Sequence, residues 1–479
     1  AILAQAILAP APRFRTPSSV SGGVHGGQRM GGAAAHFLLT YPAAPEDGER
    51  PEGPASSRHP EELWKIRVVA HNALTGAPLA DVRVSPVDSI QGLRHAIRKA
   101  SGTPSNYGLR LIFKGRILPA LDLVSRCGID DEAHVFIVLE QYRPAVTCSS
   151  DGFARVWDWH SGKCRSILEG HNGEVNSAAF DPEHERVVTA SSDHTSIIWN
   201  VQDGSACTRL IGHRLPVVSA AFGPSGETVL TCSWDCTARI WDAVSGCCRV
   251  EMSGHSGPVL QALFSPNGEA VLTSSTDSTA RLWDPRTGEV LFTLEGHRDW
   301  VVSAVFSRDG EQVLTVSRDR LGRVWELSEG LCVLSLEGHS SWVTSGAFAP
   351  DGHAAVTASD DCTARLWDVQ RSEPGACSAV LRGHASRVCC AAFADDGLLV
   401  LTASLDHTAM LWEAATGACR MTLRGHTDSL NHACFVPDDD WLVTASQDGT
   451  ARVWDLDSGE IHSKLEGHRS AVRSIAFAL

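Results

Sequence analysis

The stretch GHRSAVRSIAFAL, residues 467–479, decides the fold because it begins a repeat that the chain does not finish. A Gly-His pair at the equivalent point begins seven repeats upstream, and a Trp follows later in each of those repeats. No Trp follows the last pair. At the other end of the repetitive region, Ser149, Asp151 and Trp157 occur with no Gly-His pair before them. Together the two ends supply one complete repeat, so we expect residues 471–477 to form the innermost strand of the first sheet.

The spacing of the repeats indicates the architecture. The pairs are 42 residues apart, with a single interval of 45. A period of this length with a G-H…W-D pattern resembles the WD40 family, which implies four-stranded blades around a central channel. We therefore predict a mainly β protein in which residues 145–479 form an eight-bladed WD40 β-propeller closed by its C-terminal strand. The alternative is a truncated sequence whose missing part adds further blades.

The resemblance also implies a buried hydrogen-bond relay in each blade. In the family, an Asp accepts from its own turn and from a His, the His bonds a hydroxyl, and the hydroxyl bonds the Trp indole. Each satisfied group avoids a penalty of about 1–3 kcal/mol. Because the pattern recurs in every repeat, we interpret it as structural rather than as a hydrolase triad. The sets assigned to the first complete repeat and to the joined ends are His171, Ser191, Asp193 and Trp199, and Ser149, Asp151, Trp157 and His468.

Residues 62–140 show a different pattern. Residues 64–69 and 79–84 alternate as two strands of a hairpin, residues 90–97 carry apolar side chains at helical spacing, and later strands follow. This order, together with LRLIFKGRIL and DLVSRCGIDDEAHVFIVL, resembles ubiquitin. We therefore predict a small α+β ubiquitin-like (β-grasp) domain before the propeller. The chain runs on into the next domain where ubiquitin has its Gly-Gly tail, so this domain is built in.

The resemblance places Ile112 and Val138 in the apolar patch through which ubiquitin is recognised, with Phe136 beside them. Alternation gives independent support, because Phe136 and Val138 must face outward if Val135 and Ile137 face the core. We interpret the patch as a site for ubiquitin-reading partners. The alternative is that the propeller covers it.

The WD40 resemblance implies that partners bind where the innermost strands begin. The residues on either side of the first Val and the residue before the relay Asp lie there. They vary between repeats, and Arg and aromatic residues at such positions often contribute 2 kcal/mol or more each to binding. They would suit a peptide with an apolar anchor and an acidic or phosphorylated group. The alternative is that they are exposed side chains with no shared partner. The candidates are Trp234, Trp300, Arg318, Trp342, Asp360, Arg387, Leu405 and Arg473.

These features predict a non-enzymatic scaffold or adaptor. Its propeller would bind protein partners, and its ubiquitin-like domain would recruit ubiquitin-reading partners. The alternative function is a substrate receptor of a cullin-RING ubiquitin ligase, because Trp283-Asp284-Pro285-Arg286 resembles the docking box of such receptors. The sequence contains no Gly-rich phosphate loop, metal-ligand cluster or unique nucleophile–base pair, so we expect no catalytic residue, cofactor or metal.

Composition limits the remaining classes of function. A net charge of −15 argues against nucleic-acid binding, and no apolar run is long enough to span a membrane. Residues 1–60 are rich in Ala, Gly and Pro and are expected to be a disordered tail, although organelle transit peptides have a similar composition. The 15 cysteines are expected to be small buried thiols in a reducing compartment. We expect a monomer in the cytoplasm, with the nucleus as the alternative.

Overall fold

The computed structural model describes residues 66–73, 77–86, 90–101, 107–114, 116–118, 124–125, 127–141, 144–370, 375–436 and 441–478. The predicted tail at 1–60 lies outside these residues. The described chain is mainly β, with one helix, α1 (Ile90–Ser101), among its described residues.

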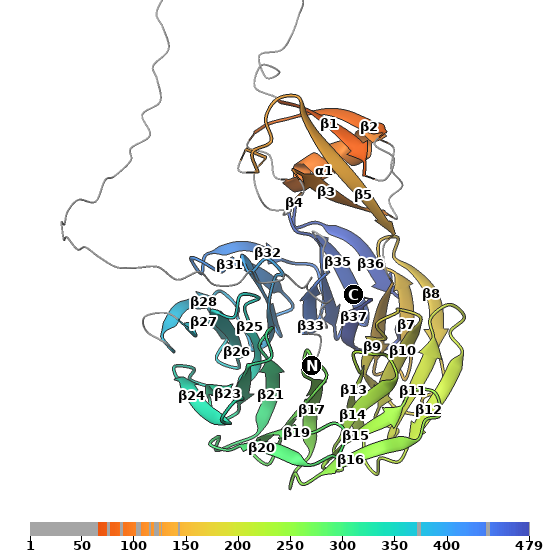
Figure 1. Ribbon diagram of the computed structural model, residues 1–479, viewed down its shortest axis with the longest axis vertical. Helices are drawn as coiled ribbons and strands as arrows, with labels where there is room; N and C mark the ends of the chain where they lie inside the picture. Colours follow the sequence, from red (N-terminus) through yellow and green to blue (C-terminus); the bar gives the residue numbers. More distant parts are fainter. Residues whose placement is uncertain are drawn as a thin grey trace, which may run out of the picture. The chain divides into compact units, whose positions relative to one another are not determined.

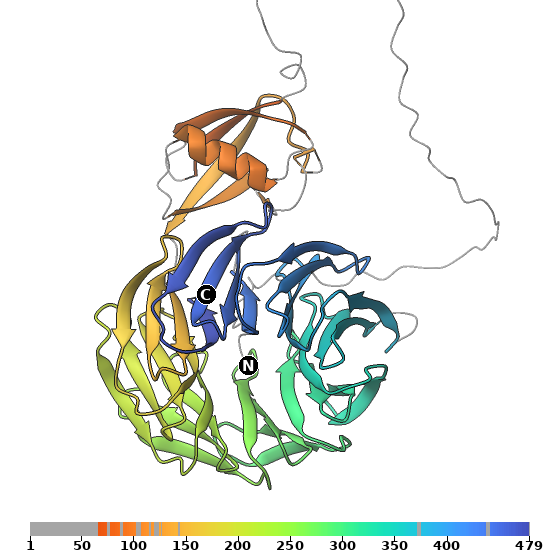
Figure 2. The same ribbon diagram turned by 180° about the vertical axis from the view of Figure 1, so that it is seen from behind.

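The first sheet has five strands in the order β2-β1-β5-β3-β4. Its two central strands, β1 and β5, are parallel, and the other neighbours are antiparallel. Helix α1 contributes Leu93 and Ile97, both fully buried, to the core of this sheet. Figure 2 shows the helix lying across one face of the sheet. The strands are β1 (Ile66–Asn72), β2 (Pro78–Val84), β3 (Tyr107–Phe113), β4 (Arg116–Ile117) and β5 (Ala133–Gln141).

The alternation predicted for β5 is confirmed. Val135 and Ile137 are 0% and 1% exposed and lie in the core, whereas Phe136 between them is 41% exposed. Ile112 on β3 lies directly opposite Phe136 and is half-buried. The side chain of Val138 lies outside the part of the structure that is described.

The rest of the described chain forms eight four-stranded antiparallel sheets (Figure 1). In each sheet the innermost strand pairs with the next strand of its repeat, and the fourth strand has no partner on its outer edge. The first four sheets consist of β37, β6, β7 and β8 (Val472–Phe477, Ala145–Ser149, Ala154–Asp158, Lys163–Leu168); β9 to β12 (Val175–Phe180, Arg186–Ser191, Thr195–Asn200, Ala206–Ile211); β13 to β16 (Val217–Phe222, Thr228–Ser233, Thr237–Asp242, Cys248–Ser253); and β17 to β20 (Val259–Phe264, Val271–Ser275, Ala280–Trp283, Val290–Leu294). The other four consist of β21 to β24 (Val301–Phe306, Gln312–Ser317, Gly322–Glu326, Leu331–Leu336); β25 to β28 (Val343–Phe348, Ala354–Ser359, Thr363–Asp368, Cys377–Arg382); β29 to β32 (Val388–Phe393, Leu399–Ser404, Ala409–Glu413, Cys419–Leu423); and β33 to β36 (Leu430–Phe435, Trp441–Ser446, Thr450–Asp455, Ile461–Glu466).

The last strand pairs with the first strand of the repetitive region, as predicted. In β37, Val472 lies opposite Ser149 and Ile475 lies opposite Thr147 of β6. Both Val472 and Ile475 are fully buried. Strand β37 also contacts β33 and β9.

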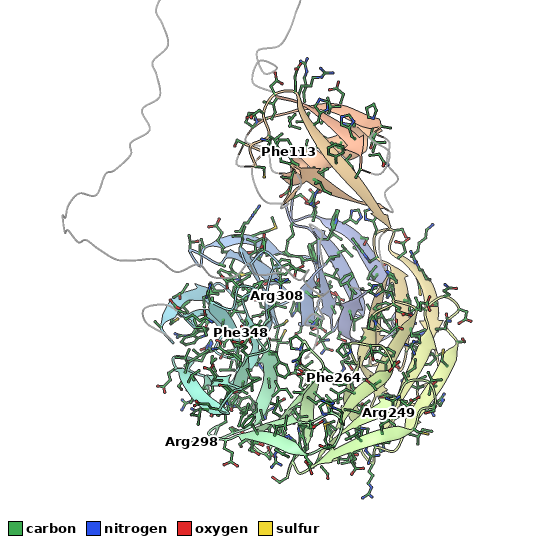
Figure 3. The ribbon with its side chains drawn as sticks, viewed as in Figure 1. Phe113, Arg249, Phe264, Arg298, Arg308 and Phe348 are labelled. Carbon is green, nitrogen blue, oxygen red and sulfur yellow. The ribbon has the colours of Figure 1, made fainter. Side chains whose placement is uncertain are left out.

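The apolar cores of these sheets lie between neighbours. One cluster, for example, contains Val146 and Val156 of one sheet together with Val187 and Trp199 of the next. A single sheet could not cover both of its faces, so each depends on the sheets beside it. Each innermost strand ends in a Phe, two of which, Phe264 and Phe348, are labelled in Figure 3.

Every innermost strand also begins with a β-bulge. The register shifts between its first and third residues, so the second residue is extra, as at Val218 and Val302. Such a bulge re-aims the side chain of the extra residue. The eight bulge residues are Asn176, Val218, Leu260, Val302, Thr344, Cys389, Asn431 and Arg473.

The expectation that the cysteines are buried is wrong for the outermost strands. All 15 cysteines are free, and those opposite the repeat Trp on an outermost strand are exposed. The physical reason is that the fourth strand has a sheet neighbour on one edge only, so a small side chain there stays open to solvent. These exposed cysteines are Cys164, Cys248, Cys332, Cys377 and Cys419.

Candidate functional site

Each four-stranded sheet contains a buried relay, illustrated by β9 to β12. The Trp199 indole Nε1 donates to Thr189 Oγ1 over 2.8 Å, and Thr189 Oγ1 lies 2.8 Å from His171 Nε2. His171 Nδ1 lies 2.8 Å from Asp193 Oδ2. Since a carboxylate only accepts, Nδ1 carries the hydrogen, and Nε2 of the neutral ring accepts from the hydroxyl of Thr189. Every polar group of the relay is therefore satisfied.

The relay hydroxyl belongs to Thr189, so the assignment of Ser191 to that role is wrong. Ser191 Oγ accepts from the N–H of Asp193 over 3.1 Å instead. Both residues face the same side of β10, because side chains alternate with a period of two. Ser191 is the last residue of the strand and reaches only the turn, whereas Thr189 lies within reach of the indole.

The joined ends of the chain form the same relay. Trp157 Nε1 donates to Thr147 Oγ1 over 2.7 Å, and this hydroxyl lies 2.8 Å from His468 Nε2. His468 Nδ1 lies 3.0 Å from Asp151 Oδ2. The assignment of Ser149 is wrong for the same reason as that of Ser191: it accepts from the N–H of Asp151, next to the turn, over 3.1 Å.

The relay keeps its imidazole neutral and its carboxylate charged. Burial lowers the pKa of His468 to about 4, with a further contribution from Arg155. Burial alone would raise the pKa of Asp151, but hydrogen bonds from the N–H of Arg469 and from His468 lower it to about 2. Hydrogen bonds of the same kind recur in all eight four-stranded sheets of the described chain, which indicates a framework rather than a single active site.

The two candidate positions of each repeat lie side by side. The N–H of Arg318 donates to the carbonyl of Trp300 over 3.0 Å, and Leu405 donates to Arg387 over 2.9 Å. The equivalent bond recurs in every four-stranded sheet of the described chain. The remaining donor–acceptor pairs are Ser150–Ala471, Ser192–Glu174, Trp234–Pro216, Thr276–Pro258, Asp360–Trp342 and Gln447–Ser429.

Three of the predicted side chains meet across two neighbouring sheets. The guanidinium carbon of Arg318 lies 3.7 Å from the ring centroid of Trp300 and 4.5 Å from that of Trp342. Trp300 and Trp342 are 39% and 42% exposed, so the guanidinium bridges two partly open indoles. Stacking of this kind is typical of Arg, whose planar charge is weakly hydrated. We call Trp300, Arg318 and Trp342 the Trp–Arg–Trp cluster.

Two other predicted arginines form ion pairs. Arg387 Nε donates to Asp360 Oδ1 over 2.6 Å. Arg473 Nη2 donates to Glu174 Oε2 over 2.6 Å. Within the described part of the chain, no such ion pair with a carboxylate occurs at Arg318. Arg318 therefore differs from Arg387 and Arg473, whose guanidinium groups pair with carboxylates.

The remaining candidates on this face lie apart from the cluster. Trp234, 50% exposed, stands on the sheet β13 to β16, and the sheet β17 to β20 separates it from Trp300. Leu405 is half-buried, and its carbonyl accepts from Ser429 Oγ over 3.1 Å. Sequence reasoning missed most of the bulge residues, although each directly follows the first residue of its innermost strand.

The candidate docking residues lie in an ordinary turn. Asp284 Oδ1 accepts from the N–H of Arg286 over 2.7 Å, and the Arg286 side chain is exposed. Asp242 and Asp455 make similar bonds within the corresponding turns of their repeats. Asp284 therefore has a structural role that is independent of docking.

The candidate patch of the five-stranded sheet is flanked by two histidines. Phe136 lies opposite both Ile112 on β3 and His71 on β1. The rings of His71 and Phe136 have centroids 5.8 Å apart, and His71 Nε2 lies 2.7 Å from His134 Nδ1. The patch thus combines apolar and imidazole groups on one face of the sheet.

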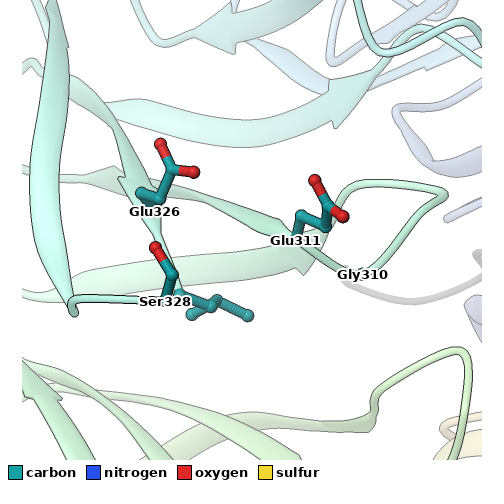
Figure 4. Close-up of a pocket in the computed structure, with 5 residues that line it drawn as sticks. Gly310, Glu311, Glu326 and Ser328 are labelled. Atoms are coloured by element: carbon teal, nitrogen blue, oxygen red, sulfur yellow. The ribbon is translucent and has the colours of Figure 1, made fainter.

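A shallow pocket lies at the opposite end of β22 from Arg318 (Figure 4). Gly310, Glu311, Glu326, Leu327 and Ser328 line it, and it contains none of the predicted site residues. Among the described residues, no group of three or more His, Cys, Asp or Glu is placed to hold a metal ion. No helix in the described ranges is long and apolar enough to cross a membrane.

Comparisons with known proteins agree with this geometry. The family model described as WD domain, G-beta repeat matches seven segments, which together cover more than half of the chain. Among solved structures, the chain is similar to the computationally designed Ika8 protein, with 28% identity and a TM-score of 0.57 over 64% of this chain and 90% of that chain. No curated protein matches the chain. The segments matched by the family model are 162–200, 204–242, 246–284, 288–326, 330–368, 375–413 and 417–455.

The relay predicts that Thr189→Val destabilises the protein more than Thr189→Ser. Valine keeps the shape of threonine but leaves Trp199 Nε1 and His171 Nε2 without a partner, at about 1–3 kcal/mol each. Serine keeps the hydroxyl and loses one buried methyl group, worth about 1 kcal/mol. Urea unfolding at pH 7.5 measures both variants. Equal midpoints for the two would contradict the role assigned to the hydroxyl.

The buried histidines predict that stability falls below pH 6.5. Burial lowers the pKa of His468 and of His432 to about 4 from the ordinary value of 6.5. The unfolded chain therefore binds their protons first, and stability is lost as the pH falls from about 6.5 through about 4. Urea midpoints between pH 7.5 and 4 test this. In His432→Gln, which copies Gln261 at the equivalent position of β17, the dependence on pH should be weaker. An unchanged pH profile in that variant would contradict the assignment.

Proposed function

Because the chain belongs to the WD domain, G-beta repeat family, we propose that it is a non-enzymatic scaffold that binds protein partners at the Trp–Arg–Trp cluster. WD40 repeats generally mediate protein interactions as scaffolds. The observation that carries the proposal is the bridge between Trp300, Arg318 and Trp342, which joins aromatic surface to a positive charge without an acidic partner in the described structure.

The proposal includes an eight-bladed propeller closed by β37. The pairing of β37 with β6 supports closure, as does its contact with both β33 and β9. Closure pairs β6 with β37, and without it β6 would be an unpaired edge strand of the kind that invites aggregation. A closed ring would also hold the candidate positions of all repeats on one face.

The cluster has the composition of an interface hot spot. Trp and Arg are enriched where truncation costs 2 kcal/mol or more of binding free energy. Trp300 and Trp342 remain open enough to bury further area against a partner. The partner that fits is a protein segment with an apolar side chain and an acidic or phosphorylated group, because a guanidinium binds such anions through paired hydrogen bonds.

We further propose that the five-stranded domain is ubiquitin-like and recruits ubiquitin-reading partners. The strand order β2-β1-β5-β3-β4 with one helix in the described chain supports this. The exposed Phe136 opposite Ile112 provides an apolar patch of the expected kind. The 15 free cysteines support a reducing compartment, for which we propose the cytoplasm.

A second candidate function is that of a substrate receptor for a cullin-RING ligase. The observation in its favour is that Arg286 is exposed on a turn held by Asp284. In such a receptor, Arg286 would contact the cullin adaptor while the Trp–Arg–Trp cluster binds the substrate.

The main proposal predicts that the triple variant Trp300→Ala, Arg318→Glu, Trp342→Ala loses its partners. Affinity purification with crosslinking from cells should show at least about a tenfold drop in recovery, because three hot-spot side chains are removed. A matched control changes Leu291→Ala, Arg308→Glu and Leu331→Ala, which are exposed residues of the same kinds away from the cluster. The control should retain the partners.

An unchanged partner list in the cluster variant would refute the proposed face. The variant Phe136→Ala should lose ubiquitin-reading partners and retain the others, with Lys99→Ala on the exposed side of α1 as its control.

The second candidate predicts that a cullin adaptor is recovered with the wild-type chain and is lost specifically in Arg286→Ala. The exposed guanidinium would be the contact, so the urea midpoint should not change. Recovery of the adaptor with Arg286→Ala, or its absence from the wild-type sample, would exclude the receptor role.

A further inference from the structure

The bulge residues divide the candidate face into two halves of different chemistry. On the sheets that begin with β13, β17 and β21, the bulge residues are Val218, Leu260 and Val302, all half-buried. On the other five sheets of the described chain the bulge residues are polar or carry a thiol. The apolar bulges are consecutive, so they form one continuous sector.

The polar bulge residues bind the neighbouring sheet. Asn176 Nδ2 donates to the carbonyl of Val217 over 2.8 Å, and Asn431 Nδ2 donates to that of Val472 over 2.7 Å. Thr344 Oγ1 donates to the carbonyl of Val388 over 2.6 Å in the same way. These side chains are used within the protein. The side chains of valine and leucine have no hydrogen-bonding group, so those of Val218, Leu260 and Val302 make no such bond.

Large exposed apolar side chains lie in this sector and next to it. Leu215 and Trp234 are 45% and 50% exposed beside the first apolar bulge. Trp300 is 39% exposed beside the last, and Trp342, 42% exposed, stands on the following sheet, which begins with β25. Single exposed apolar residues need no explanation, but several on neighbouring repeats indicate a binding surface.

The charge of Arg318 indicates which kind of chemical group would bind in this sector. The guanidinium of Arg318 is stacked on indoles, so its N–H groups are directed along the edges of its plane. An edge of this kind matches two oxygens of a carboxylate or a phosphate. A cationic side chain is disfavoured, because it would approach the positive charge of Arg318. Arg387 and Arg473, in contrast, are neutralised by Asp360 and Glu174.

We propose that a peptide segment of a partner protein crosses the apolar sector. Its aliphatic or aromatic anchor would contact Val218, Leu260 and Val302, and a carboxylate or phosphate would bind Arg318. The opposite half of the face would stay unoccupied. This inference rests on the proposed function and adds which half of the face is used and which groups the partner carries.

To test this proposal, peptides that bind the full chain are selected from a phage-displayed random library. Enriched peptides should share an acidic residue at a fixed spacing from an apolar residue. Synthetic copies are then measured against Arg318→Glu and Val302→Asn, the second of which introduces the residue found at the Asn176 and Asn431 bulges. Binding should weaken by at least about tenfold in each. The double variant Ser429→Ala, Gln447→Ala changes the equivalent positions of the polar half and should weaken binding less than about twofold.

Peptides made with Glu, phosphoserine or Gln at the acidic position distinguish the two anions. Binding of either anion with loss on Gln supports the proposal and identifies the anion. Enriched peptides without an acid that still lose binding in the triple variant of the Trp–Arg–Trp cluster would overturn this inference and leave the proposed function intact. Peptides sensitive only to Ser429→Ala, Gln447→Ala would count against both. Peptides insensitive to every variant of the face, or a selection that enriches none, would count against both. Urea midpoints of each variant confirm that it is folded.

Discussion

The hydrogen bonds between His468 and the first sheet are the constraint on which the structure depends. His468 belongs to the last residues of the chain, whereas Thr147, Asp151 and Trp157 belong to the first strands of the repeats. None of these buried groups can lose its partner without cost, since an orphaned polar group in the interior is penalised by about 1–3 kcal/mol. The two ends are therefore held together by the same relay that organises every other sheet. The bond from Ser150 to Ala471 also places the candidate positions of the closing sheet beside each other.

Repetition separates the residues that make the fold from those available for binding. The relay residues and the apolar clusters recur in each sheet, so they are framework. The residues joined by the Arg318–Trp300 type of backbone bond are placed by that framework, but none of their side chains belongs to the relay. The side chains at these positions differ between repeats. On two neighbouring sheets they form a cluster of two indoles and one guanidinium. Because the backbone bonds fix these positions, a partner that binds at the cluster, as proposed, would have less backbone to order.

The spacing of Gly-His pairs and Trp residues was enough to predict the four-stranded sheets, and the incomplete last repeat predicted the pairing of β37 with β6. The relay hydroxyl could not be chosen in this way, because Thr189 and Ser191 face the same side of one strand and both carry a hydroxyl. Only the strand register shows which of them reaches Trp199. The bulges could not be predicted from the spacing either. Every repeat contains the same extra residue, so the bulge does not change the distance between equivalent residues. The contact of Arg318 with Trp342 depends on packing between different repeats, which the pattern of a single repeat does not contain.

The two parts of the face differ in what the side chain of the bulge residue does. It either forms a hydrogen bond with the next sheet or leaves apolar surface partly exposed. Asn431 and Thr344 each give the next sheet a hydrogen bond, which is worth about 0.5–1.5 kcal/mol. Val218, Leu260 and Val302 forgo that bond in three consecutive sheets and remain only half-buried, so they recover little of it through burial. These three sheets therefore lack the side-chain hydrogen bond that Asn431 and Thr344 make to the next sheet. Under the proposed function this is what a binding surface beside Arg318 would require, because side chains that bond to each other within the protein have no groups left for a partner.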